Sequence, residues 1–159
     1  LFILVSSINN ISLSNIKFED VNNIKIFGLN NNENEKLLND IKILNLNNIF
    51  FLNRNIISKI ISSNSLVENY EIFKKYPSTL DIRIQKTKFL AKIRNKGQVF
   101  LIGSNGMLSN VKYSDEELPF IFGKPKIEEF LELIEIIDQS KFTLKDIKIF
   151  IFFHLRDGT

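Results

Sequence analysis

The most informative segment of this chain is Lys74-Lys75-Tyr76-Pro77-Ser78-Thr79-Leu80-Asp81-Ile82-Arg83-Ile84. Proline lacks an N–H and biases the preceding residue towards extended geometry, so we expect a strand to end near Tyr76. After this break, Leu80, Ile82 and Ile84 alternate with polar residues, which is typical of a half-buried strand. The segment therefore predicts two strands, over about residues 67–75 and 79–87, joined at Pro77.

The sequence before this segment predicts another strand and a helix. The patterns of Ile16–Phe18 and Ile24–Ile26 are strand-like, and the second ends at Gly28. Asn32, followed by Glu35 three residues later, has the spacing of a capping box and predicts the start of a helix. The apolar face of this helix is expected to contain Leu37, Leu38, Ile41 and Leu44.

A second helix is predicted between this helix and the two strands. Asn53 or Asn55 can serve as its N-cap, and Ser62-Ser63-Asn64 ends it. Its apolar face is formed by Ile56, Ile57, Ile60 and Ile61. The resulting order is β-α-α-β-β, in which two helices can cover one face of a three-stranded sheet.

The second half of the chain predicts more strands and one helix. Short strands at about 90–94 and 99–102 flank the turn Asn95-Lys96-Gly97, and Asn105-Gly106 is a second turn signal. Residues with helical spacing follow, namely Ile127, Phe130, Leu131, Ile134 and Ile137. From Ile147 to Phe153 a strand with two apolar faces is predicted. Its simpler interpretation is a strand inside a larger sheet, and the alternative is an edge that captures a partner.

The composition is that of a globular chain. A length of 159 residues suits one mid-sized domain or two small ones, and 44% hydrophobic with 25% charged residues is too apolar for disorder. Isoleucine, asparagine, lysine and phenylalanine share A/T-rich codons and make up about half of the chain, so we interpret the asparagine runs as surface filler. Basic residues concentrate in 74–96 and acidic residues in 113–138. This asymmetry favours internal complementarity over a nucleic-acid surface.

Few residues offer chemistry. The chain has no cysteine, which excludes disulfides and thiolate sites, and His154 is its one histidine. Gly103-Ser104-Asn105-Gly106 lacks the spacing of a phosphate-binding loop and predicts a tight turn. An acidic face is expected on the third helix, where it is solvated and contains Glu128, Glu129, Glu132 and Glu135. We therefore predict no catalytic residue, cofactor or metal site.

Several segments in order resemble the FtsQ/DivIB cell-division family. They are Ile24-Lys25-Ile26-Phe27-Gly28-Leu29, Asn48-Ile49-Phe50-Phe51-Leu52, Leu66-Val67-Glu68, Lys75-Tyr76-Pro77-Ser78-Thr79-Leu80-Asp81-Ile82, Gln85-Lys86-Thr87-Lys88-Phe89-Leu90-Ala91, and Leu118-Pro119 with Gly123. The family's proline before Ala91 is absent here. The residues that carry the resemblance are Gly28, Tyr76, Pro77, Leu80, Ile82, Ala91, Pro119 and Gly123.

The resemblance implies an α+β fold, with a β-α-α-β-β POTRA domain at 16–88 and an incomplete, mainly antiparallel β domain with one helix at 89–159. Residues 1–15 would be the end of a membrane helix or a linker. The apolar run Leu1–Val5 is by itself too short to cross a bilayer. The chain would then be a fragment whose C-terminal strands are missing.

The resemblance also implies a function. The chain would be the periplasmic part of a single-pass inner-membrane protein, a non-enzymatic scaffold of the divisome. In the family, FtsB held with FtsL adds a strand to the β domain near its C-terminal end, and the nearest candidate residues here are Phe150, Phe152 and Phe153. The alternative is a POTRA module of an outer-membrane assembly or secretion protein that chaperones unfolded β-strands. Tandem POTRA copies and a downstream barrel pattern would favour that alternative.

Overall fold

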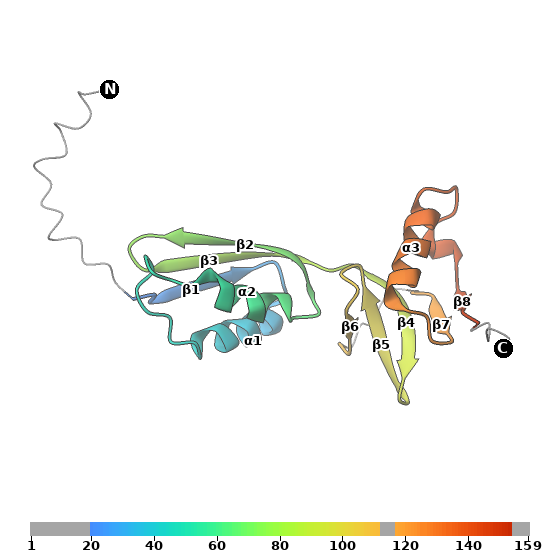
Figure 1. Cartoon of the computed structure of the whole chain (residues 1–159), viewed down its shortest axis with the longest axis horizontal. Helices are drawn as coiled ribbons and strands as arrows, with labels where there is room; N and C mark the ends of the chain where they lie inside the picture. Colours follow the sequence, from blue (N-terminus) through green and yellow to red (C-terminus); the bar gives the residue numbers. More distant parts are fainter. Residues whose placement is uncertain (1–19, 112–116, 154–159) are drawn as a thin grey trace, which may run out of the picture.

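The computed structural model describes residues 20–111 and 117–153, which form two sheets and three α-helices (Figure 1). The elements are, in order, β1 (Asn23–Phe27), α1 (Asn31–Lys42), α2 (Arg54–Ser62), β2 (Val67–Lys75), β3 (Thr79–Lys86), β4 (Phe89–Asn95), β5 (Gln98–Gly103), β6 (Leu108–Ser109), β7 (Phe120–Phe122), α3 (Ile127–Asp138), the short 3-10 helix η2 (Leu144–Asp146) and β8 (Ile149–Ile151). The predictions for residues 1–15, Ile16–Phe18 and His154 lie outside the described residues.

The first module, residues 20–86, has the predicted β-α-α-β-β order. Its sheet is ordered β1-β3-β2, with β1 parallel and β2 antiparallel to the central strand β3. Both helices lie on one side of this sheet (Figure 1). The turn between β2 and β3 contains Pro77, as predicted, and the Tyr76–Pro77 peptide bond is cis.

The core of the first module lies between the sheet and the helices. Leu80 and Ile82 are fully buried and Ile84 is 7% exposed, which confirms the alternation predicted for β3. They pack against Leu37 and Ile41 of α1 and against buried side chains of α2.

One polar residue of β3 departs from the predicted alternation. Asp81 points to the sheet face opposite the helices, yet it is only 4% exposed. It lies between the paired residues Lys25 of β1 and Phe73 of β2, and its carboxylate forms an ion pair with Lys75. Arg83 and Gln85 on the same face of β3 are exposed, so the burial of Asp81 is particular to this position.

The helix starts follow the predicted chemistry, with one shift in position. The N-cap of α1 is Asn30 rather than Asn32, and its side chain accepts a hydrogen bond of 2.9 Å from the N–H of Glu33. The capping-box prediction with Asn32 and Glu35 was therefore wrong by two residues. Asn30 and Glu33 have the same three-residue spacing, so the pattern alone did not distinguish the two pairs. Asn53, one of the two predicted residues, caps α2 through the N–H of Asn55.

The second module, residues 89–153, contains a five-stranded sheet ordered β6-β5-β4-β7-β8. The β4–β5 hairpin turns at Lys96 and Gly97, both with positive φ, as the turn signal predicted. The sheet is mixed rather than mainly antiparallel, because β4 pairs with β7 and β7 with β8 in parallel. Helix α3 connects β7 to β8, and such a crossover returns the chain in the same direction.

Helix α3 covers one face of the second sheet. Phe130 is fully buried and Ile134 is 5% exposed, and they pack with Ile121 of β7 and Phe150 of β8. The four glutamates at 128, 129, 132 and 135 are exposed, which confirms the predicted solvated face of this helix.

The two modules meet at a hydrogen-bonded junction formed by residues 65–68, 87–88 and 104–105. One carboxylate oxygen of Glu68 accepts hydrogen bonds from the hydroxyls of Thr87 (2.9 Å) and Ser104 (2.7 Å). The side-chain amide of Asn105 donates to the carbonyl of Val67 at 2.9 Å and to that of Ser65 at 3.1 Å. The Gly103–Gly106 segment is therefore a turn, as predicted, and it also ties the second sheet to β2 of the first.

We expect the Asn105→Ala variant to loosen this junction. The change removes the donor to two partly buried carbonyls, which destabilises a protein by about 1–3 kcal/mol. Differential scanning calorimetry should show a lower and broader transition, because the modules then unfold less cooperatively. Asn110→Ala removes an exposed asparagine just after β6 and serves as the control. An Asn105→Ala transition identical to that of the control would contradict a coupling role for the junction.

Candidate functional site

One edge of the second sheet is the strand β8. This strand pairs with β7 only, so its other side is an edge within the described residues. The N–H of Phe120 donates to the carbonyl of Lys148, and the N–H of Phe152 donates to the carbonyl of Phe122, both at 2.9 Å. In a parallel ladder alternate residues point their backbone groups to opposite sides. The N–H and C=O groups of Ile149 and Ile151 therefore face away from β7.

Within the described residues this edge position differs from the simpler of the two sequence interpretations. An interior strand was favoured because both faces of Ile147–Phe153 are apolar. In the structure only one face is covered: Phe150 is 8% exposed, whereas Ile149 and Ile151 are 54% and 60% exposed. Helix α3 covers the face that contains Phe150, and no described element covers the face that contains the two isoleucines.

The exposed apolar surface of Ile149 and Ile151 continues onto the neighbouring strand β7. Ile151 is paired with Phe122, which is 52% exposed, and Ile149 is paired with Phe120, which is half-buried. The rings of the two phenylalanines lie 5.0 Å apart. We call these four residues the β7–β8 apolar face. Sequence reasoning did not identify Phe120 and Phe122, because the strand β7 was not predicted.

The three predicted partner-binding residues do not form one surface. Phe150 and Phe152 pack on the core residue Phe130, with ring centroids 5.6 Å and 6.5 Å apart. Phe153 is 82% exposed and lies beyond the end of β8. Phe150 and Phe152 therefore pack on the core, with Phe152 still partly exposed, whereas Phe153 is largely exposed.

The family-motif residues occupy positions where their residue type has a physical reason. Gly28 and Gly123 have φ values of 113° and 99°, and a Cβ on either would overlap a backbone carbonyl, that of Ile84 or of Phe152. Ala91 is fully buried, and Pro119 is among the fully buried side chains of the second module. Tyr76, in contrast, is 59% exposed in the β2–β3 turn.

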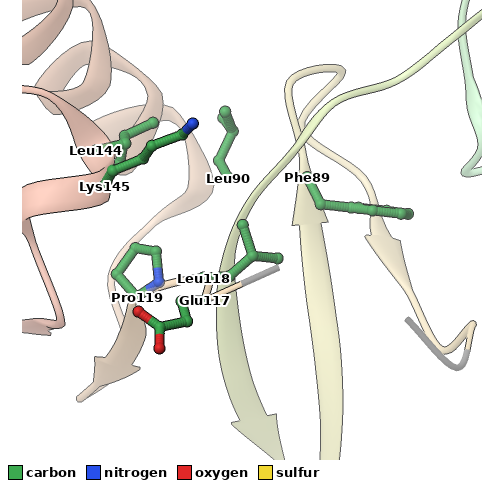
Figure 2. Close-up of a pocket in the computed structure, with 7 residues that line it drawn as sticks. All are labelled: Phe89, Leu90, Glu117, Leu118, Pro119, Leu144 and Lys145. Carbon is green, nitrogen blue, oxygen red and sulfur yellow. The ribbon is translucent and has the colours of Figure 1, made fainter. Parts of the chain in front are cut away.

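A hollow of about 410 Å³ lies beside β7. It is lined by Phe89, Leu90, Glu117, Leu118, Pro119, Leu144 and Lys145 (Figure 2). Figure 2 shows that the ring of Phe89 points away from Leu144 and Lys145. The lining is mainly apolar, and the carboxylate of Glu117 is solvent-exposed and lies 3.6 Å from the ammonium group of Lys148. No set of polar groups converges in this hollow, as a catalytic site would require.

Asp146, next to Lys145 at this hollow, has a structural role. The hydroxyl and the backbone N–H of Thr143 donate to the Asp146 carboxylate at 2.8 Å and 3.1 Å, and these hydrogen bonds hold the pKa of Asp146 below its usual value. They form the capping box of η2. Within residues 20–111 and 117–153, no group of three or more His, Cys, Asp or Glu side chains could hold a metal ion.

The basic segment 74–96 is divided rather than gathered into one patch. Lys75 is paired with Asp81, and the ammonium group of Lys86 lies 3.7 Å from a carboxylate oxygen of Glu33. Arg83 lies over the ring of Phe73, with its guanidinium carbon 5.0 Å from the ring centroid. None of these partners lies in the acidic segment 113–138, so the ion pairs of the described residues do not show the complementarity expected between the basic and acidic segments.

No helix in the described parts of the chain combines the length and the apolar character that a bilayer span requires.

Comparison with known proteins identifies the type of the first module. Residues 20–86 match the model of the POTRA domain, FtsQ-type. The chain is also 30% identical over 99 residues to the cell division protein DivIB of Streptococcus gordonii. This match covers 57% of the chain and 25% of the relative, so the chain spans about a quarter of that protein's length. The resemblance predicted from the sequence motifs is thereby confirmed for the POTRA domain and for a distant relationship to DivIB.

Proposed function

We propose that this chain, which contains an FtsQ-type POTRA domain and is a distant homologue of DivIB, is part of a non-enzymatic scaffold in bacterial cell division. In this proposal the two modules lie on the outer side of the cytoplasmic membrane, in the periplasm or its equivalent, and the protein is anchored by a single membrane helix. The POTRA domain would occupy residues 16–88 and the β domain residues 89–159.

The observation that supports a binding role most directly is the edge strand β8. An open strand edge next to exposed apolar side chains is a template for the addition of a partner strand. Here the backbone groups of Ile149 and Ile151 would supply the pairing, and the β7–β8 apolar face would contact alternate side chains of the added strand. We propose an extended segment of FtsB, held with FtsL, as this partner strand.

The Ile151→Pro variant tests the proposed pairing. Proline removes the N–H of residue 151, which faces away from β7, so the hydrogen bonds within the sheet are kept while one carbonyl of the added strand loses its donor. Binding of the FtsB–FtsL outer segment from the same genome, followed by isothermal titration calorimetry, should weaken at least about tenfold. The titration is made with the chain and with the complete product of its gene.

Ile151→Val is the matched control, because valine keeps the N–H, the β-branched shape and most of the apolar surface. It should bind within about threefold of the original chain and unfold at a similar temperature. Undetectable binding of the original proteins at about 50 μM would reject the proposed partner. If Ile151→Pro instead unfolds the complete gene product, the edge of β8 is covered by the protein itself and the partner binds elsewhere.

The alternative role in outer-membrane assembly is supported less well. It rests on the POTRA architecture alone, whereas the matched domain model is of the FtsQ type and the relative is a division protein. Binding of unfolded barrel strands at the edge strand β2, with no binding of division proteins, would favour this alternative.

A further inference from the structure

One end of the POTRA module presents apolar side chains that the proposed partner binding does not use. At this end the described chain begins at Asp20, and the α1–α2 loop and the β2–β3 turn lie beside it (Figure 1). We call this surface the N-terminal tip, and it consists of residues 20–22, 43–52 and 76–78.

Hydrogen bonds hold the three segments of the N-terminal tip together. The N–H of Val21 donates to the carbonyl of Asn47 at 3.4 Å, and that of Asn22 donates to the carbonyl of Ser78 at 3.0 Å. The ammonium group of Lys74, on the helix side of β2, donates to the carbonyl of Phe50 at 3.2 Å. The loop is therefore fixed against the sheet, and its exposed side chains are presented on an ordered base.

The N-terminal tip exposes four large apolar or aromatic side chains. Phe51 is 80% exposed, Ile43 75%, Tyr76 59% and Phe50 51%. The rings of Phe50 and Phe51 are in edge contact, with centroids 5.3 Å apart. Scattered exposed apolar residues need no explanation, but several large ones on adjoining loops indicate an interaction surface.

Two basic side chains without an ion-pair partner flank the N-terminal tip. Lys42 and Arg54 are exposed at the end of α1 and the start of α2, and no ion pair within the described residues engages either one. Lys75 is neutralised by Asp81, and the exposed acidic residues nearby are Asp20 and Asp40. Exposed aromatic side chains flanked by unpaired basic ones are a pattern expected for contact with an anionic lipid surface.

The sequence before the N-terminal tip is also apolar. Ten of the first 19 residues are Leu, Ile, Val or Phe, and two are charged. This segment precedes Asp20 directly in the sequence, so it joins the described chain at the N-terminal tip.

We propose that the N-terminal tip binds the surface of an anionic lipid bilayer. Phe51, Ile43 and Tyr76 enter the interfacial region, and Lys42 and Arg54 contact the headgroups. A lipid surface fits better than a protein partner, because the exposed apolar groups project from a loop and a turn rather than line a groove. The open strand edges of the first sheet run along the module and do not lie at this end. This inference is independent of partner binding at β8.

The experiment is co-sedimentation of the complete 159-residue chain with vesicles of phosphatidylcholine containing phosphatidylglycerol, compared with pure phosphatidylcholine. We expect binding to the anionic vesicles, reduced at least about tenfold in the double variant Ile43→Ser/Phe51→Ser. The variant Lys42→Ala/Arg54→Ala should bind the anionic vesicles several-fold more weakly, and added salt should weaken binding of the original chain. All four side chains are exposed, so the variants should fold.

The matched control is Phe142→Ser/Phe153→Ser, which removes two exposed rings, 69% and 82% exposed, from the second module. It should bind vesicles like the original chain. Unchanged binding by Ile43→Ser/Phe51→Ser would overturn the proposal and assign binding to residues 1–19, which every variant retains. Absence of vesicle binding by the original chain would also overturn it and would leave a protein partner as the occupant of the N-terminal tip.

Discussion

The Ile82→Asp variant is expected to lose the cooperative unfolding transition of the POTRA module. Ile82 is fully buried in the central strand β3, and it is paired with Ile26 of β1 on one side and Ile72 of β2 on the other. A carboxylate at this position would have no partner in an apolar core. The expected loss is about 4 kcal/mol or more, which is comparable with the whole stability of a small domain.

The measurement is urea unfolding followed by circular dichroism, with hydrogen exchange to locate the unfolded part. Amides of β1, β2 and β3 should lose protection. Gln85→Asp is the control, because it introduces the same charge on an exposed position of the same strand. It should change the stability by less than about 1 kcal/mol. A stable Ile82→Asp variant would mean that the register of β3, and with it the POTRA assignment, is wrong.

The Phe130→Ala variant is expected to destabilise the second module by about 3–5 kcal/mol. Phe130 is fully buried where α3 meets the sheet, and its ring contacts those of Phe150 and Phe152 in edge geometry. Truncation would leave a cavity in the middle of a small core, and it would remove the contacts that hold β8 against α3.

Ile136→Ala provides the comparison for this variant, because Ile136 lies on the same helix and is 63% exposed. Its stability should stay within about 0.5 kcal/mol of the original chain. Thermal unfolding gives the stability, and partner titration with Phe130→Ala tests whether an ordered β8 is needed for binding. Equal stability of the two variants would show that α3 is not the cover of this sheet.

The two variants also test whether the modules are independent. Each module has its own buried cluster, but the junction at Glu68 and Asn105 connects them. We expect Ile82→Asp to lower the hydrogen-exchange protection of the amides in β5, next to the junction, more than that of the amides in β8. The strand β8 lies at the far edge of the second sheet. Equal losses in both strands would mean that the chain unfolds as one unit.

The candidate binding surface was predicted only in part from the sequence. The apolar content of Ile147–Phe153 indicated a strand that must be covered or must capture a partner, and this led to Phe150, Phe152 and Phe153. Which side chains are exposed depends on where α3 packs. In the structure α3 buries Phe150, so the exposed side chains of the strand are Ile149 and Ile151, with Phe122 beside them.

The local structure of this chain was encoded in short stretches of sequence. The period-2 pattern of Leu80, Ile82 and Ile84, the asparagine caps and the Lys96-Gly97 turn were read from residues at most a few positions apart. These features depend on backbone dihedral preferences and on local hydrogen bonds. The β-α-α-β-β order followed from them, whereas the resemblance to the POTRA domain was carried by the ordered motif segments, such as Lys75-Tyr76-Pro77-Ser78-Thr79-Leu80-Asp81-Ile82.

Only the tertiary structure decided the strand order, the covered faces and the junction. Asp81 is buried although it faces away from the helices, and the crossover through α3 places β8 outside β7, at an edge of the sheet within the described residues. Asn105 bonds to the carbonyl of Val67, 38 residues away. Such contacts join residues far apart in the chain, and their energies depend on which elements come together. A local sequence pattern does not specify which elements will pack against each other.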